Sequence, residues 1–153
     1  LKGISQIFLE NEYMGKTTIP YTPQGKSEDF VIGTENRISA NKELVKKFED
    51  TSGMFGGNRR ISYEYKLTIE NNLKQGKTVV VYDAIPVSQN KKIEIEIKDP
   101  SIPFDNTNNF AKSSKFKKGI RRWKLFLGPN SKKEITYRVI IIFDKDVRVK
   151  GLK

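Results

Sequence analysis

The chain has 153 residues and carries 29 Lys and Arg side chains against 18 Asp and Glu, a formal net charge of +11. It contains no Cys and no His, which excludes disulfide frameworks, zinc fingers, iron–sulfur clusters, thiol nucleophiles and histidine general bases. The longest uninterrupted apolar run, residues 139–143, is far shorter than the roughly 18 residues of a membrane-spanning helix. These counts predict a basic domain with no transmembrane segment, no metal and no cofactor.

The first third of the chain gives faint strand signals at residues 4–10, 17–20 and 30–32. The pattern of residues 41–50 is ambiguous, because three apolar side chains there also suit one face of a helix, namely Leu44, Val45 and Phe48. An extended strand instead gathers four apolar residues on one side, namely Ile38, Ala40, Leu44 and Phe48. We expect the strand.

The middle of the chain contains the clearest strand signal. Apolar and polar residues alternate strictly from 61 to 70, which predicts a half-buried strand. Turn-forming residues follow at 71–76, and residues 78–82 are apolar on both faces, a pattern that predicts a hairpin into a more central strand. Pro86 should end that strand because it has no N–H group. Residues 92–98 alternate again, with Ile inward and charged residues outward.

After a long polar stretch, the alternation resumes at residues 123–127 and forms a second long ladder at residues 135–143. A short terminal strand is expected around Val147 and Val149. Eight or more short strands, separated by turn signals at intervals of about 8–15 residues, predict an all-β chain with little or no helix. The expected architecture is an antiparallel β-sandwich of the immunoglobulin-like or jelly-roll-like kind.

Four segments share their order and spacing with a known family. They are Tyr13–Thr17 with Ile19-Pro20, Phe30–Ile38, Tyr65–Asn71 continuing to Asp83-Ala84-Ile85-Pro86-Val87-Ser88, and Trp123–Leu127 continuing through Tyr137–Val139 to Val149–Leu152. Together they resemble the C-terminal domain of the bacterial mucoidy-inhibitor A (MuiA-type) family, a domain of unknown function. The resemblance implies that residues 1–153 form a single sandwich domain at the end of a longer protein. It also favours the cell envelope or periplasm, and it brings no catalytic residues.

Two glycine motifs have both a functional and a structural interpretation. Gly15-Lys16-Thr17 resembles the end of a phosphate-binding P-loop, but Glu10 stands where that loop requires its first glycine. We therefore expect a β-turn at residues 15–17. Residues 52–58 are rich in glycine and have no dinucleotide fingerprint. We expect a hairpin tip there, with Met54 and Phe55 as a candidate loop for a protein partner.

Several carboxylates also have both a functional and a structural interpretation. Residues 105–109 lack the Gly and the closing Glu of a calcium loop, so a solvated loop is expected. Glu94 and Glu96 share one strand face, and paired carboxylates can cleave glycosides, although the outer face of a half-exposed sheet is the favoured interpretation. For Asp83, just before Pro86, we expect an Asx-type hydrogen bond that terminates the strand.

The main electrostatic feature is a basic segment near the start of the Trp-containing strand. Its cations are interleaved with aromatic side chains, an arrangement that can neutralise phosphates and stack on bases. The alternative is a solvated loop that leads into a strand, with Trp123 in the core and Arg122 and Lys124 pointing outward. The candidate binding patch consists of Lys112, Lys115, Phe116, Lys117, Lys118, Arg121, Arg122 and Lys124.

The favoured function is a non-enzymatic interaction module. Its partner would be another protein or the missing N-terminal region of its own protein, bound through a sheet edge or the loops at 51–58 and 105–120. One rival is a polyanion binder that recognises nucleic acid or an acidic glycan through residues 112–124. The other rival is a carbohydrate-binding or carbohydrate-active domain. The oligomeric state is not predicted.

Overall fold

The structure, a computed structural model, describes residues 3–9, 12–21, 23–25, 33–50 and 58–147. The contacts divide the chain into two units, Leu1–Asn36 and Arg37–Lys153. Strands account for 61% of the described residues and helices for 6%, and the strand pairs are antiparallel, so the prediction of an all-β fold is confirmed. The single domain over residues 1–153 stays a prediction.

The first unit contains an antiparallel pair, β1 (Gly3–Leu9) with β2 (Glu12–Ile19). The register shifts between Ile7 and Phe8, which places one extra residue in β2 next to Gly15. Gly15 has a φ of 138°, a conformation that favours glycine. The Gly-Lys-Thr motif therefore runs along a bulged strand. The expected β-turn at this position is wrong, because cross-strand pairing with β1 keeps the backbone extended.

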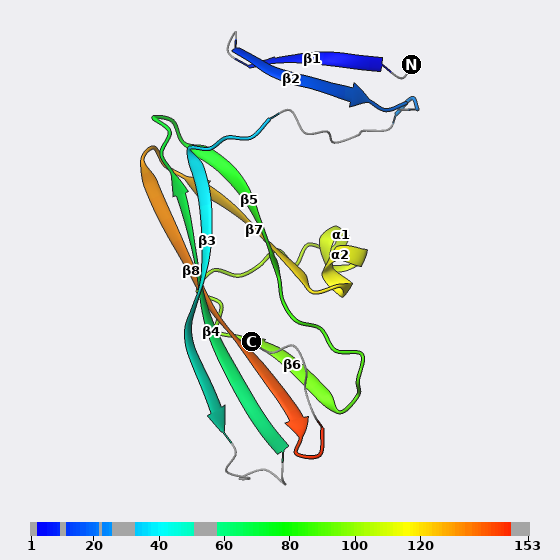
Figure 1. Cartoon of the computed structure of the whole chain (residues 1–153), viewed down its shortest axis with the longest axis vertical. Coiled ribbons are helices and arrows are strands. Elements are labelled where there is room, and N and C mark those ends of the chain that lie inside the picture. Colours follow the sequence, from blue (N-terminus) through cyan, green and yellow to red (C-terminus); the bar gives the residue numbers. More distant parts are fainter. Residues whose placement is uncertain (1–2, 10–11, 22, 26–32, 51–57, 148–153) are drawn as a thin grey trace. The chain divides into compact units, whose positions relative to one another are not determined.

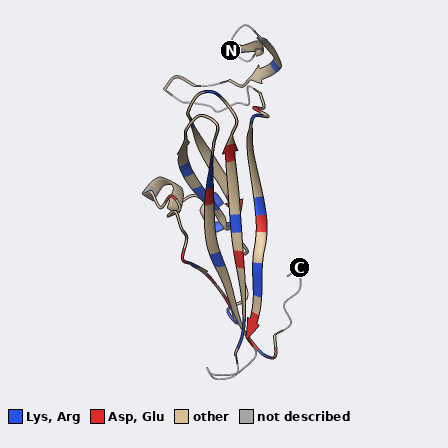
Figure 2. Ribbon diagram, turned by 90° about the vertical axis from the view of Figure 1, so that its left-hand side faces the viewer, with Lys and Arg blue, Asp and Glu red and all other residues tan. Residues whose placement is uncertain are grey.

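Four strands of the second unit form one antiparallel sheet in the order β3–β4–β8–β6 (Figure 1). Their bounds are β3 (Ile38–Asp50), β4 (Asn58–Asn71), β6 (Ile93–Lys98) and β8 (Ser131–Asp144). The strand predicted for residues 41–50 is therefore confirmed. β3 and β6 lie at the two edges of this sheet. Charged residues of both signs follow one another along β3, as expected for an edge strand that must resist pairing (Figure 2).

A second, two-stranded sheet consists of β5 (Lys77–Ala84) and β7 (Ile120–Leu127). Two single helical turns precede β7 in the chain, α1 (Asn108–Ala111) and α2 (Ser114–Lys117). β5 pairs with β7, whereas β4 pairs with β3 and β8. The predicted hairpin between β4 and β5, with β5 as a more central strand, is therefore wrong.

Asn71 explains why the chain changes sheets after β4. Its side chain is fully buried, and its Nδ2 donates hydrogen bonds to the carbonyl oxygens of Gln75 at 2.9 Å and Gly128 at 2.7 Å. Its Oδ1 accepts the N–H of Leu73 at 3.1 Å. These bonds satisfy backbone groups of two separate turns, so they stabilise a corner between the sheets in place of a hairpin.

A β-bulge changes which face of β3 each apolar residue occupies. The register with β4 shifts between Leu44 and Lys46, so that Val45 is the extra residue. Leu44 pairs with Tyr65 on the core side, whereas Phe48 pairs with Ser62 on the opposite side. The expectation that Leu44 and Phe48 share one side is therefore wrong.

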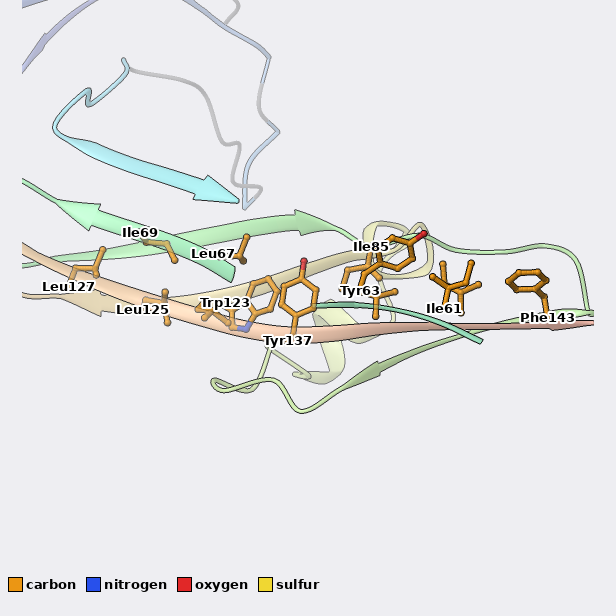
Figure 3. Packing of buried hydrophobic residues seen from close by; sticks show 13 residues of the cluster. Ile61, Tyr63, Leu67, Ile69, Ile85, Trp123, Leu125, Leu127, Tyr137 and Phe143 are labelled. Atoms are coloured by element: carbon orange, nitrogen blue, oxygen red, sulfur yellow. The ribbon is translucent and has the colours of Figure 1, made fainter. Parts of the chain in front are cut away.

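The core lies between the two sheets (Figure 3). Trp123 is 1% exposed, stacks on Tyr137 with ring centroids 6.1 Å apart, and donates its indole N–H to the carbonyl of Ile102 at 2.9 Å. Both predicted ladders turn their apolar rows into this core, which confirms their period-two interpretation. The buried cluster comprises Ile61, Tyr63, Leu67, Ile69, Ile85, Trp123, Leu125, Leu127, Ile135, Tyr137, Val139, Ile141 and Phe143.

Some sequence predictions concern residues that the structure does not describe. These are the strand at 30–32, the loop residues Met54 and Phe55, and the part of the terminal strand around Val149. Val147 is described, but it follows a turn, in which its N–H donates to the carbonyl of Asp144 at 2.9 Å, and is not in a strand. Its side chain packs against the core cluster.

Candidate functional site

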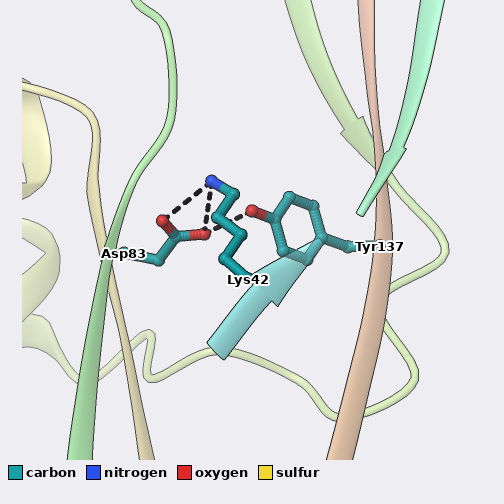
Figure 4. A network of polar contacts seen from close by, with 3 residues as sticks. All are labelled: Lys42, Asp83 and Tyr137. Atoms are coloured by element: carbon teal, nitrogen blue, oxygen red, sulfur yellow. Dashed lines mark hydrogen bonds and ion pairs between the residues drawn. The ribbon is translucent and has the colours of Figure 1, made fainter. Parts of the chain in front are cut away.

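Three polar side chains meet between the sheets: Lys42 from β3, Asp83 from β5 and Tyr137 from β8 (Figure 4). The Nζ of Lys42 lies 2.9 Å from Oδ1 and 3.0 Å from Oδ2 of Asp83. The hydroxyl of Tyr137 donates to Oδ2 of the same carboxylate. The Asx-type bond predicted for Asp83 is therefore wrong, because its carboxylate is only 11% exposed and serves two partners from the other sheet.

The surroundings of Tyr137 keep its phenol protonated. Burial, followed by the hydrogen bond to Asp83, raises the pKa of Tyr137 well above its ordinary value. The phenol therefore stays protonated and acts as a donor at neutral pH. The Lys42 ammonium also lies 4.4 Å from the centre of the Tyr65 ring, and burial raises the pKa of Tyr65. An ammonium, a carboxylate and a neutral phenol arranged in this way cross-link three strands.

The basic segment divides into two groups with different roles. Its five lysines are exposed, and none forms an ion pair with a described residue. Arg122, by contrast, donates from Nε to Asp105 at 3.0 Å and lies 4.2 Å from the centre of the Phe110 ring. Two members of the candidate patch, Arg122 and Phe116, are thus partly buried in the corner formed by α1, α2 and β7.

Arg121 is held in the same corner. Its guanidinium lies 4.0 Å from the centre of the Phe116 ring, and one terminal nitrogen donates to the carbonyls of Phe116 at 3.1 Å and Ile120 at 3.2 Å. Its Nε is buried and has no hydrogen-bond partner among the described residues. Burial lowers the pKa of the guanidinium from its ordinary value, although an arginine remains charged at neutral pH.

The acidic loop before α1 is tied to β7. Asp105 donates its own N–H to the carbonyl of Arg122 at 2.7 Å, and its Oδ1 accepts the N–H of Thr107 at 2.8 Å. The hydrogen bonds from Thr107 and then from Arg122 lower the pKa of Asp105 to about 2. The expectation of a solvated loop at 105–109 is therefore wrong for Asp105. No group of three or more His, Cys, Asp or Glu that could hold a metal occurs in the described ranges.

Glu94 and Glu96 lie on the face of β6 that points away from the core, and Glu96 pairs with Lys98 at 3.2 Å. Glycoside cleavage needs two carboxylates that face each other across a bound sugar. An aromatic platform beside them would also have to be exposed, but Trp123 is buried. These residues do not form the arrangement that the carbohydrate-active hypothesis requires.

The sequence analysis predicted the lysines on the outward face of β5 and β7 but missed its apolar residues. Val80, Tyr82 and Phe126 are 48%, 51% and 61% exposed, and Lys124 pairs directly with Val80 between them. Lys115 extends this surface, because its Nζ lies 5.4 Å from the centre of the Tyr82 ring. We call these five residues the outward face. The sequence signal that could have revealed these residues is the apolar run at 78–82. Its even-numbered residues form an exposed row, whereas the pattern was interpreted as buried on both faces.

A groove of about 480 Å³ lies along the core-side face of β6. One wall is the segment that follows β5, and the opposite wall is the row Ile93, Ile95 and Ile97, which is only half-buried. We call this the β6 groove. Its lining residues are Ile85, Pro86, Val87, Ser88, Ile93, Ile95, Ile97, Phe104, Lys117 and Arg121.

Gly119 allows the end of β5 to lie close to the start of β7, beside the β6 groove. The N–H of Ile85 donates to the carbonyl of Gly119 at 2.9 Å, which joins the end of β5 to the start of β7. Gly119 has a φ of 88°, and a Cβ added there would lie 2.2 Å from the carbonyl oxygen of Ile85. Only glycine permits both this conformation and this close approach.

The fold and its surfaces define an all-β domain whose exposed features are an apolar, basic sheet face and a groove beside an edge strand. Residues 5–145 match the model of a family described as Domain of unknown function (DUF4139), and the chain belongs to that family. Comparisons with curated proteins and with solved structures gave no match. In the part of the chain that is described, no helix is long and apolar enough to cross a bilayer.

Proposed function

We propose that this domain is a non-enzymatic interaction module that binds an acidic protein surface through the outward face of β5 and β7. The resemblance of its segments to the MuiA-type domain supports placing it in an envelope-associated bacterial protein. The observation that carries the proposal is the exposure of Val80, Tyr82 and Phe126 side by side with lysines on one sheet face.

The composition of this face is that of a protein interface. Specific interfaces have an apolar, often aromatic centre and a polar rim, and their aromatic residues supply much of the binding energy. Here Val80, Tyr82 and Phe126 would supply the apolar contacts, Lys124 would lie among them, and Lys115 would lie at the rim. Clustered exposed apolar residues on a monomer usually mark such a site.

The positive charge of the outward face favours an acidic partner. The register puts Thr78, Val80 and Tyr82 opposite Phe126, Lys124 and Arg122, so this side of the two strands carries no acidic residue. Arg122 is already paired with Asp105, which leaves the lysines to interact with a partner. Acidic groups around an apolar centre would complement them, whereas a second copy of the same basic face would be repelled.

A photo-crosslinking amino acid placed at Phe126 tests the proposal in cells that make the whole protein. A matched probe at Phe48 is the control, because that side chain is 58% exposed on the other sheet. We expect a discrete crosslinked protein from position 126 that is absent from position 48. Equal crosslinking at both positions, or turnover by the purified domain on any panel of substrates, would contradict the proposal.

A second candidate function is polyanion binding, which the five exposed lysines of the basic segment favour. Binding to a single-stranded oligonucleotide or an acidic glycan would then weaken linearly on a plot of log K against log salt. With five cations, the slope would not be steeper than about −4. Charge reversal by Lys117→Glu and Lys118→Glu should reduce that slope. Binding that is absent at low salt would dispose of this candidate.

A further inference from the structure

We propose that the β6 groove binds an extended acidic segment of a partner protein, which adds as a strand to the free edge of β6. This site is separate from the outward face of β5 and β7 and depends on its own evidence. The proposal rests on three features: an edge strand, an apolar groove along its core-side face, and cations in the groove wall.

The first feature is the unpaired edge of β6. Within the described ranges, β6 pairs with β8 alone, from Ile93 opposite Phe143 to Lys98 opposite Arg138. Its other edge therefore presents backbone N–H and C=O groups that an extended peptide can pair with. Strand addition of this kind draws affinity from main-chain hydrogen bonds and specificity from the pockets for alternate side chains.

The second feature is the groove beside that edge. Ile93, Ile95 and Ile97 point to the core side of β6, but they remain half-buried because the two-stranded sheet does not cover them completely. Alternate side chains of an added strand would point to the same side, since neighbouring strands in a sheet share their faces. They would enter the groove between the isoleucine row and the segment that contains Pro86 and Val87. At about 480 Å³, the groove has room for two or three aliphatic side chains.

The third feature is the charge of the lining. Lys117 and Arg121 line the groove, and its lining residues include no Asp or Glu. Lys117 is exposed and forms no ion pair with a described residue. Arg121 has a buried Nε without a hydrogen-bond partner in the described chain. Because that Nε is enclosed, a carboxylate on the bound segment would pair with the exposed ammonium of Lys117, and the nearby charge of Arg121 would add to the attraction.

The positive charges of Lys117 and Arg121 also indicate which kind of segment would bind in the groove. The residues that follow Val147 include Arg148 and Lys150, and the chain as a whole carries a net charge of +11. Residues 148–153 therefore lack the charge that Lys117 and Arg121 would attract, and two copies of a domain with this net charge repel each other. An acidic partner segment with apolar residues at alternate positions meets both requirements of the site.

The test uses the full chain and three fluorescein-labelled peptides with blocked termini. The acidic probe alternates Val and Thr and has Glu at each end; the basic probe has Lys at each end. The third probe is acidic but carries N-methyl groups on alternate backbone nitrogens, which removes its ladder hydrogen bonds. Fluorescence anisotropy gives each Kd, and hydrogen exchange reports on the amides of residues 93–98. We expect binding of the acidic probe alone, with slower exchange in β6.

Two charge reversals separate a local contact from general attraction. Lys117→Glu, in the groove, should weaken the acidic probe about three- to tenfold. Lys112→Glu changes the net charge equally but lies outside the groove lining, and it should change the Kd less than about twofold. Equal losses in both variants, equal binding of acidic and basic probes, or no saturable binding would overturn the proposal. So would acidic-probe binding that appears only after residues 148–153 are deleted, or a dimer that excludes the probe.

Discussion

The hydroxyl of Tyr137 donates a hydrogen bond to the carboxylate of Asp83 across the interior of the sandwich, and the two residues stand 54 positions apart in the chain. Because Lys42 binds the same carboxylate, this contact joins strands of both sheets. A hydrogen bond to a charged, largely buried group contributes more than a neutral one at the surface. The cluster therefore holds β5 in its place over the larger sheet.

Tyr137→Phe removes the hydroxyl from this cluster while keeping the ring. We expect the free energy of unfolding to fall by about 1.5–3 kcal/mol, as for other hydrogen bonds to charged groups. Urea denaturation followed by Trp fluorescence measures the loss. Tyr63→Phe is the matched control, since the buried Tyr63 hydroxyl has no hydrogen-bond partner among the described residues. That variant should be neutral or slightly more stable, and equal losses in both would contradict a special role for the Asp83 contact.

The same phenol should make stability depend on alkaline pH. Its pKa is raised in the folded protein, so the unfolded chain ionises first as the pH passes the ordinary value of 10.0. Stability that depends on the protonated phenol is complete below that value and decreases as the pH rises further. The difference in unfolding free energy between the native protein and Tyr137→Phe should therefore be smaller at pH 11 than at pH 8. A constant difference over this range would show that the folded-state pKa of Tyr137 is ordinary.

Asp105 should produce the opposite dependence in acid. Its pKa is lowered from 3.8 to about 2 in the folded protein, so its contribution is present above pH 4 and is lost as the pH falls toward 2. Asp105→Asn should flatten the fall in thermal stability between pH 4 and pH 2. Asp146→Asn, which changes an exposed carboxylate in the turn after β8, should leave that fall unchanged. Identical acid profiles for the two variants would contradict the assignment.

Gly119→Ala should destabilise the corner between β5 and β7. The added Cβ meets the carbonyl oxygen of Ile85 at 2.2 Å, and the positive φ adds strain, so we expect a loss of about 1–3 kcal/mol or more. Gly128→Ala is the control, because its Cβ would meet only the Ser131 hydroxyl at an ordinary 3.6 Å. Chemical denaturation of both variants makes the comparison, and a Gly119→Ala protein as stable as the control would refute the close approach.

The sequence was sufficient to predict the features that depend on local periodicity. The alternating rows in residues 61–69 and 135–143 could be assigned to the core, because a period of two leaves one apolar face that must be buried. Trp123 could be placed in the core for the same reason. The strand at 41–50 was also predicted, although the bulge at Val45 reversed the side of Phe48, and the pattern contains no signal for an inserted residue.

The remaining features depend on contacts between distant residues. The role of Asp83 requires Lys42, which is 41 positions away, and the role of Arg122 requires Asp105, which is 17 positions away. The corner at Asn71 depends on the carbonyl of Gly128, 57 positions away. The prediction of a single basic patch was also incomplete. An arginine can pack on Phe rings and pair with an acid, while lysines beside it remain in solvent.

The most direct test of the proposed function uses the absence of cysteine from residues 1–153. Single variants Val80→Cys, Phe126→Cys and Phe48→Cys can each be labelled with a maleimide, in the isolated domain and in the cells that make the whole protein. We predict rapid labelling of all three in the isolated domain, and protection of positions 80 and 126 but not 48 in the cell. If all three positions react equally fast in both settings, the outward face of β5 and β7 is not covered by a partner.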